Sequence, residues 1–216
     1  MSEIPLPVEP GYNCELCPRL VAYRTDNRKL KPDWFNGPVP SFGKLNAQLL
    51  IVGLAPGLKG ANMTGRPFTG DHAGNLLYGT LEKYNLSKGK YLADLNDGLT
   101  LVNCRITNAV KCVPPNNKPI AFETTQCRSF LKSEIKAMRN LRVILALGRI
   151  SHDSTVSALG LKRSQWPFRH SLHHRLPTGL ILVDSYHCSR YNTNTRRLTI
   201  QMFCEVFESL HNIFAD

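Results

Sequence analysis

The sequence predicts an α/β protein with three layers (α/β/α), in which helices cover both faces of a central, mainly parallel sheet of four strands. Four short apolar runs alternate with segments of helical spacing, and turn-forming residues end each run. Apolar strands that alternate with helices are typical of parallel sheets that are buried on both faces. The expected strands are residues 48–53, 99–108, 142–147 and 180–184.

The helices are expected between and around these runs. A CxxC pair, Cys14 and Cys17, leads into the first helix, and residues 31–43 form a loop rich in proline, glycine and aromatic side chains. Residues 161–177 are polar, basic and aromatic, which indicates a loop or a hairpin. Helical spacing predicts further helices at residues 73–84, at 122–138, from about 151 onward and at 199–214.

A long irregular segment follows the first strand at Gly53. It begins Gly-Leu-Ala-Pro-Gly and carries glycines at positions 60, 65, 70 and 74, one aromatic residue, Phe68, and one acid, Asp71. Ligands of parallel sheets bind beyond the carboxyl ends of the strands. The positions expected to face a ligand are those that follow the strands: 55–71, Asn108, Gly148 and His187.

Two nucleotide-binding motifs do not fit this segment. A dinucleotide fingerprint needs GxGxxG, but the turn after Gly53 contains Ala55 and Pro56. A phosphate-binding P-loop needs a lysine after its second glycine, and Asp71 stands there instead. A carboxylate at that point repels phosphate, so both motifs are excluded.

Composition and charge indicate the class of partner. The 216 residues are 42% hydrophobic, and 27 Lys+Arg against 16 Asp+Glu give a formal net charge of +11. This size predicts one domain, residues 1–216, and the charge favours nucleic acid over a membrane surface, with a surplus for solubility as the alternative. We expect a cytoplasmic protein, because the sequence has no leader pattern and no apolar run long enough to span a bilayer. We also expect a monomer.

Seven cysteines in such a chain indicate metal or redox chemistry rather than disulfides. Cys14 and Cys17 form the CxxC pair, and Cys112 and Cys127 flank a polar segment that contains prolines. This spacing suits a four-thiolate zinc site and a [4Fe–4S] cluster equally well. The other three cysteines stand apart and are expected to be structural.

Four motifs together resemble the uracil-DNA glycosylase superfamily, and within it the family-5 enzymes of the iron–sulfur type. They are GLAPG (53–57), GANMTGRPFTGD (60–71), ITNAVKCVPP (106–115) and SYHCSRYNTNT (185–195). The chain departs from the family pattern at two places. Cys188 stands where the family has proline, and Arg196 stands where it has glycine.

The resemblance implies a DNA glycosylase that flips out a damaged base and hydrolyses its bond to the sugar. Phe68 is then the stacking floor, Asn108 reads the edge of the base, and His187 donates a hydrogen bond to it as charge develops. Asp71 orients water and stabilises the positively charged sugar. The implied catalytic residues are Asp71, Asn108 and His187, and the implied base-binding residues are Ala55, Gly57, Phe68, Asn108 and His187.

Each of these residues also has an ordinary structural reading. Gly70-Asp71 before a helix is typical of an N-cap, and Phe68 can anchor its own loop. Asn108 can be a turn residue and His187 a loop histidine without function. For Asp71 both readings can hold together.

The resemblance also implies DNA contacts and a cofactor. Tyr191 is the expected wedge into the duplex, with a surface tyrosine as the alternative. Basic residues around the crevice are expected at phosphates, among them Lys59, Lys111, Lys118, Arg163, Arg169 and Arg197. The expected DNA-binding set is Arg66, Ser189, Arg190, Tyr191 and Arg196, and the expected [4Fe–4S] ligands, with zinc as the alternative, are Cys14, Cys17, Cys112 and Cys127.

The expected activity is therefore monofunctional removal of uracil and related deaminated bases from DNA in base excision repair, which leaves an abasic site. A lyase step is not expected, because no lysine is placed to form a Schiff base. Two alternatives stay open. One is a glycosylase with a narrower preference for hypoxanthine or xanthine, and the other is a non-catalytic iron–sulfur protein that binds nucleic acid.

Overall fold

The computed structural model describes residues 6–215 of the chain. The start of the N-terminal segment (1–5) and residue 216 of the expected domain lie outside the described residues. The helices are α1 (Pro18–Leu30), α2 (Ala61–Thr64), α3 (His72–Lys83), α4 (Ala121–Ala137), α5 (Arg149–Ala158), α6 (Arg190–Asn194) and α7 (Ile200–Ala215), with 3-10 turns η1 (Pro115–Asn117) and η2 (Arg163–Gln165).

The central sheet has five strands in the order β4-β1-β5-β7-β6. The first four are parallel to one another and β6 is antiparallel to β7. A separate two-stranded antiparallel sheet pairs β2 with β3. The strands are β1 (Leu49–Gly53), β2 (Ser87–Lys88), β3 (Thr100–Leu101), β4 (Cys104–Asn108), β5 (Val143–Leu147), β6 (His173–Arg175) and β7 (Ile181–Ser185).

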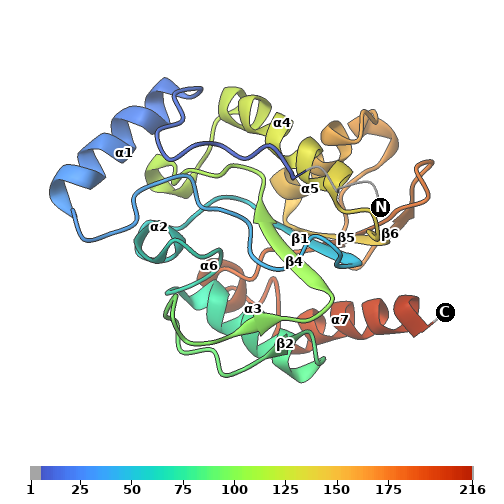
Figure 1. Cartoon of the computed structure of the whole chain (residues 1–216). Coiled ribbons are helices and arrows are strands. Elements are labelled where there is room, and N and C mark those ends of the chain that lie inside the picture. Colours follow the sequence, from blue (N-terminus) through green and yellow to red (C-terminus); the bar gives the residue numbers. More distant parts are fainter. Residues whose placement is uncertain (1–5, 216) are drawn as a thin grey trace.

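Helices cover both faces of this sheet, as predicted, with α4 and α5 on one face and α3 and α7 on the other (Figure 1). Alternate residues of each parallel strand enter opposite cores, because successive side chains of a strand point to opposite faces. Leu49 and Ile51 pack with α3 and α7, whereas Leu50 and Val52 pack with α4 and α5. The three-layer α/β/α prediction is therefore confirmed.

The structure corrects three details of the predicted elements. The sheet has a fifth strand, β6, in the segment expected as a loop or hairpin. The expected strand at residues 99–108 is two strands, β3 and β4, because the chain bends at Asn103, whose φ is 52°. Two short helices, α2 and α6, lie within segments expected to be irregular.

The N-terminal arm lies along the outside of the α4 face, and α1 is at one end of the molecule (Figure 1). Leu20 of α1 packs with Val110, Phe130 and three cysteines in a small cluster separate from the two main cores. No described helix is both long and apolar enough to cross a membrane.

Candidate active site

The ends of the parallel strands form the floor of the candidate site. Gly53, the last residue of β1, is in register with Asn108, the last residue of β4. On the other side Leu147 ends β5 in register with Ser185 of β7. A cavity of about 690 Å³ opens beyond these ends, and its lining includes Asp71 and His187 together with Ala55, Gly57, Lys59 and the segment 189–191.

Asn108 and Phe68 meet at Gly53, the residue before Leu54 of the cavity lining, and neither of them lines the cavity itself. A side chain at Gly53 would collide with Oδ1 of Asn108 and would approach the Phe68 ring to 2.6 Å. Asn108 is 3% exposed, and its Oδ1 has no hydrogen-bond partner among the described residues. Buried amide oxygens are normally satisfied, so this one has a free acceptor position that suits an N–H group of a ligand.

Phe68 is held in an unusual backbone conformation. Its φ is +54°, in the left-handed region that phenylalanine rarely adopts. The ring is 7% exposed and stacks on His187, with the ring centroids 5.9 Å apart and the planes 25° from parallel. The loop therefore accepts backbone strain and directs an aromatic ring to the strand ends.

Asp71 uses its two carboxylate oxygens differently. Oδ1 accepts a hydrogen bond of 3.0 Å from the amide of Gly74 and so caps α3. Oδ2 lies over the glycine turn, because a Cβ at Gly60 would be 2.5 Å from it and a Cβ at Gly57 would be 3.0 Å from it. The cap therefore leaves one oxygen at the cavity, so the structural and the chemical readings of this residue are compatible.

His187 follows β7, and its backbone carbonyl accepts a hydrogen bond of 2.8 Å from Asn192 of α6. Burial lowers the pKa of the imidazole below its usual value, and the Asp71 carboxylate opposes this shift only in part. The ring is therefore neutral near pH 7, with one N–H group to donate. A neutral imidazole can donate this N–H group to an oxygen on which negative charge develops, without transferring the proton to it.

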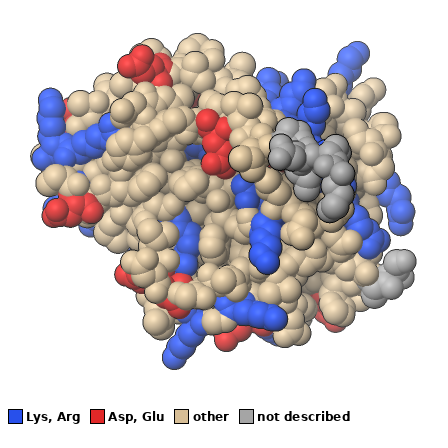
Figure 2. Space-filling model, viewed as in Figure 1, with Lys and Arg blue, Asp and Glu red and all other residues tan. Residues whose placement is uncertain are grey.

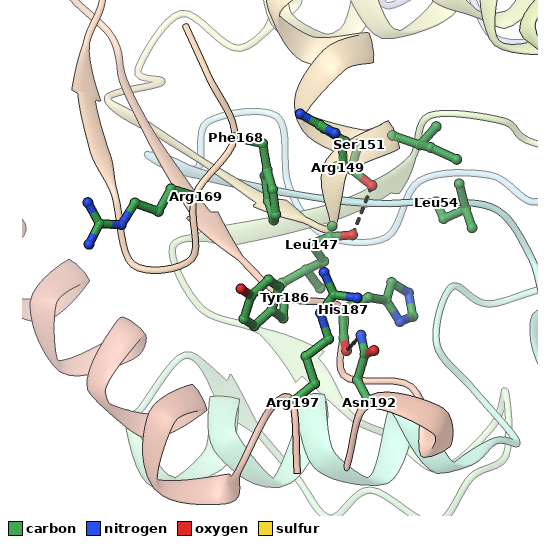
Figure 3. Close-up of a pocket in the computed structure, with 12 residues that line it drawn as sticks. Leu54, Leu147, Arg149, Ser151, Phe168, Arg169, Tyr186, His187, Asn192 and Arg197 are labelled. Carbon is green, nitrogen blue, oxygen red and sulfur yellow. Dashed lines mark hydrogen bonds between the residues drawn. The ribbon is translucent and has the colours of Figure 1, made fainter. Parts of the chain in front are cut away.

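A second chamber of about 490 Å³ adjoins the first and shares Leu54 and His187 with it. Phe168 enters it from one side, Arg197 reaches toward Tyr186 and His187 from the other, and Arg169 points away (Figure 3). None of the described residues that line it is acidic. No pattern in the sequence indicated a second chamber, although some of its lining residues were expected at the ligand edge or around the crevice, namely Gly148, Arg169, His187 and Arg197.

Four of the five expected DNA-binding residues lie at the rim of the first cavity or at the surface. Ser189 caps α6, and Arg190 and Tyr191 line the rim of the first cavity, where Tyr191 is 72% exposed. Arg196 is exposed and has a φ of 56°. Figure 2 shows that Lys and Arg side chains are distributed widely over the viewed face, with fewer acidic groups between them.

Arg66 and Lys111 are corrections to the expected phosphate contacts. Arg66 is 3% exposed, and its two terminal nitrogens pair with the Asp97 carboxylate at 2.8 and 2.7 Å. Lys111 is 2% exposed, and it donates to Ser41 at 2.7 Å and to Glu134 at 3.4 Å. Both cations are neutralised inside the protein and cannot reach a phosphate.

The four expected ligand cysteines gather in the small core beneath α1 and α4. Cys17, Cys112 and Cys127 are buried there, and Cys14 and Ala55 pack against them. Burial raises the pKa of the Cys17 thiol to about 11 and that of Cys112 to about 12. A nearby arginine offsets this shift only in part, so the free thiols are protonated near neutral pH and a bound metal centre would be needed to hold them as thiolates.

Arg24 of α1 places a positive charge among these cysteines. It is 4% exposed, donates to Sγ of Cys112 at 3.6 Å and to the carbonyl of Cys14 at 2.8 Å, and its Nε has no partner among the described residues. No described carboxylate pairs with it. A buried guanidinium requires a negative partner, and a thiolate-bound metal centre carries negative charge, so the residues fit such a group.

A different group of possible metal ligands is His152, His174 and Asp184, whose ligand atoms lie within 4.8 Å of one another. Nδ1 of His152 is 2.7 Å from Asp184 and its Nε2 is 2.7 Å from the carbonyl of Trp166. Burial lowers the pKa of His152, but the hydrogen bond and charge of Asp184 outweigh it and raise the pKa overall. The carbonyl can only accept, so this group is an ion pair that stabilises the fold rather than a metal site.

Comparison with known proteins places these features in a family. The sequence model of the Uracil DNA glycosylase superfamily matches residues 40–211. The chain belongs to this superfamily. It is 46% identical over 199 residues to a type-5 uracil-DNA glycosylase of Thermus thermophilus, covering 89% of this chain and 90% of that protein. A type-5 uracil-DNA glycosylase of Pyrobaculum aerophilum is 38% identical, covering 90% and 86%, and a type-4 uracil-DNA glycosylase of the same organism is 34% identical, covering 68% and 62%.

Of the basic residues expected around the crevice, Lys59 lines the first cavity, in the loop that follows β1. Sequence reasoning on this superfamily member missed Arg24 and the Asp184 group. No local signal could have found them, because their partners are far away in the sequence.

Proposed function

We propose that this chain is a monofunctional DNA glycosylase that removes uracil and related deaminated bases from DNA in base excision repair. The observation that carries the proposal is the unpartnered, buried Oδ1 of Asn108 at the strand ends, next to Phe68, whose ring stacks on His187 of the cavity that Asp71 also lines. Uracil presents an N–H group beside a carbonyl oxygen on one edge, and a side-chain amide can pair with both.

In the proposed complex the flipped base stacks on Phe68, and Asn108 reads its edge. A base that stacks on a ring lies about 3.5 Å from it, so a base between two rings needs them about 7 Å apart. The centroids of Phe68 and His187 are 5.9 Å apart. A base therefore cannot lie between the two rings as they stand. We propose that it displaces the His187 ring toward the edge of the base, where its N–H group meets a carbonyl oxygen.

The proposed reaction is a displacement of the base by water. The bond between the sugar carbon C1′ and the base nitrogen breaks, and its electron pair leaves with the base, where His187 stabilises the negative charge. Oδ2 of Asp71 stabilises the positive charge on the sugar and accepts a proton as the water oxygen bonds to C1′. The products are a free base and an abasic site.

The position of Lys59 requires a direct test of the monofunctional part of this proposal. A lysine amine that attacked C1′ would form a Schiff base with the opened sugar, which borohydride reduces to a stable protein–DNA adduct. We expect no adduct with the wild-type protein on an oligonucleotide that contains uracil. An adduct that disappears in Lys59→Gln would show a bifunctional enzyme instead.

We also propose that Cys14, Cys17, Cys112 and Cys127 hold a [4Fe–4S] cluster. A single tetrahedral zinc with Zn–S bonds of about 2.3 Å would draw the sulfurs to within about 4 Å of one another. Among the described residues only the His152 group comes within 4.8 Å in this way. The wider spacing of the thiols and the buried charge of Arg24 support the [4Fe–4S] cluster, which is larger than a zinc ion and negatively charged with its thiolates. Its main role would be structural.

The central test is excision from a labelled oligonucleotide with one uracil, followed by alkali to cleave the abasic site. Wild type should yield the cleaved product, and Asn108→Ala and His187→Ala should lose most of the rate. Parallel substrates with hypoxanthine and xanthine define the range of bases. Binding to DNA without cleavage of any substrate would support a non-catalytic binding protein and refute the proposal.

A further inference from the structure

We propose that the second chamber binds a nucleotide next to the flipped one on the same DNA strand, with its base against Phe168 and its phosphate between Arg149 and Arg197. This inference rests on the proposed function and deepens it. It assigns the site a contact that depends on the neighbouring nucleotide rather than on the damaged base.

The size and place of the chamber suit this ligand. Its volume of about 490 Å³ lies within the range of about 300–1,000 Å³ that small-ligand sites occupy. It shares Leu54 and His187 with the cavity proposed for the flipped nucleotide. Two sites that share a wall suit two successive nucleotides, because the DNA backbone joins them directly.

The charge of the chamber suits a phosphate. The guanidinium groups of Arg149 and Arg197 have no ion pair or hydrogen bond with any described residue, and none of the described lining residues is acidic. Arg197 lies over the Tyr186 ring, with its Cζ 4.7 Å from the ring centroid, and the His170 ring also stacks on Tyr186, with the centroids 4.8 Å apart. This stack fixes the guanidinium while its N–H groups stay free for a ligand.

Arg149 adds a second positive contribution. It is the first residue of α5, whose N-cap, Gly148, makes no side-chain capping bond. The unpaired amides of that first turn and the helix dipole favour an anion in the chamber, in addition to the two guanidinium groups.

Buried ionisable residues anchor the loop that carries Phe168. Phe168 is partly exposed on the loop between η2 and β6, and the Asp184 group holds this loop on both sides. His152 binds the carbonyl of Trp166 at 2.7 Å, and Asp184 accepts from the amide of Arg169 at 3.2 Å. A partly exposed aromatic ring on an anchored loop beside unpaired arginines is the combination that proteins use to bind single nucleotides of a strand.

The experiment is a cycle that pairs a change in the DNA with a change in the protein. Duplexes with one uracil carry a tetrahydrofuran abasic analogue directly on its 5′ side, directly on its 3′ side, or on neither. For each protein the ratio of kcat/KM on the intact duplex to kcat/KM on each abasic duplex is measured. The wild-type ratio should exceed that of Phe168→Leu by about 5- to 150-fold on one side, the range expected for one stacked base.

Comparing ratios removes the effect of the missing base on the duplex itself, because both proteins meet the same DNA. Phe122→Leu is the matched control, since Phe122 is an exposed ring of α4 outside the chamber, and it should keep the wild-type ratio. Arg197→Gln should reduce the slope of log Kd against log salt by about one.

Equal ratios for wild type and Phe168→Leu on both sides would overturn the inference while leaving the proposed function intact. A wild type that excises uracil from no duplex would overturn the proposed function first. If Phe168→Leu does not fold, wild-type affinity decides, measured by fluorescence anisotropy on the three duplexes. A Kd that neither abasic analogue changes would refute the base contact.

Discussion

Asp71 allows a test that separates structure from chemistry, because each of its carboxylate oxygens has a different environment. Oδ1 caps α3 through Gly74, and Oδ2 faces the glycine turn at the cavity. Serine is as good an N-cap as aspartate but has no carboxylate. Asp71→Ser should therefore keep the cap and lose the chemistry, whereas Asp71→Ala should lose both.

The expected magnitudes follow from these contacts. Loss of the cap in Asp71→Ala costs about 0.5–2 kcal/mol, which lowers the Tm of a domain of this size by about 1–8 °C. Asp71→Ser should stay within about 4 °C of wild type and melt above Asp71→Ala, since it loses only the charge at the helix N-terminus. Both variants should lose a factor of about 10²–10⁴ in the single-turnover rate of uracil excision.

The assay combines calorimetry with single-turnover excision at saturating enzyme. The reasoning is refuted if Asp71→Ser excises uracil at nearly the wild-type rate, because Oδ2 would then have no chemical role. It is also refuted in its structural half if Asp71→Ala melts at the same temperature as Asp71→Ser.

Three further predictions concern buried ionisable groups. Arg66→Gln leaves Asp97 buried without its partner, so the unfolding free energy should fall by about 3–5 kcal/mol, while the Kd for DNA at permissive temperature and its salt slope should not change. Arg24→Gln removes the cation beside the cysteines, so the iron content per polypeptide after anaerobic purification should fall. Lys29→Gln changes an exposed position on the same helix and should keep the wild-type iron content. Equal iron content in both variants would contradict the role of Arg24. Because burial lowers the pKa of His187, its contribution to the free energy of unfolding is full above about pH 6.5 and is lost as the pH falls through the lowered pKa. Denaturant titrations from pH 7 to 5 should therefore show a steeper loss of unfolding free energy for wild type than for His187→Gln. Parallel losses in the two proteins would argue against the shift.

The strands of the central sheet could be predicted because their signal is local. Runs such as 49–53 and 143–147 are continuously apolar, as strands buried on both faces must be. The edge of the sheet at which the candidate site lies could be predicted for a similar reason, since Asn108 ends the alternating run 99–108 and His187 comes shortly after the apolar run 180–184. The structure then brings Asn108 and Phe68 together at Gly53, a contact that spacing alone does not give.

What could not be predicted depends on partners far away in the sequence. Strand β6 consists of His173, His174 and Arg175, which have no apolar pattern, and it pairs with β7 at the edge of the sheet. Arg66 carries a charge that suggests a phosphate contact, but Asp97, 31 residues later, neutralises it inside the protein. No property of a single residue distinguishes a buried, paired arginine from a free one.

The register of β1 and β4 has a consequence for how the site moves. Gly53 ends β1, which pairs with a strand on each side, and Asn108 ends β4, the strand at one edge of the sheet. Both strands are buried along their whole length, and buried strands exchange their amide hydrogens only in rare openings of a protein. The opposite walls, residues 59–71 and 187–197, are loops and short helices, which open far more often. The Asn108 amide is thus held on a rigid strand end, whereas Phe68, Asp71 and His187 lie in the segments that can open around it.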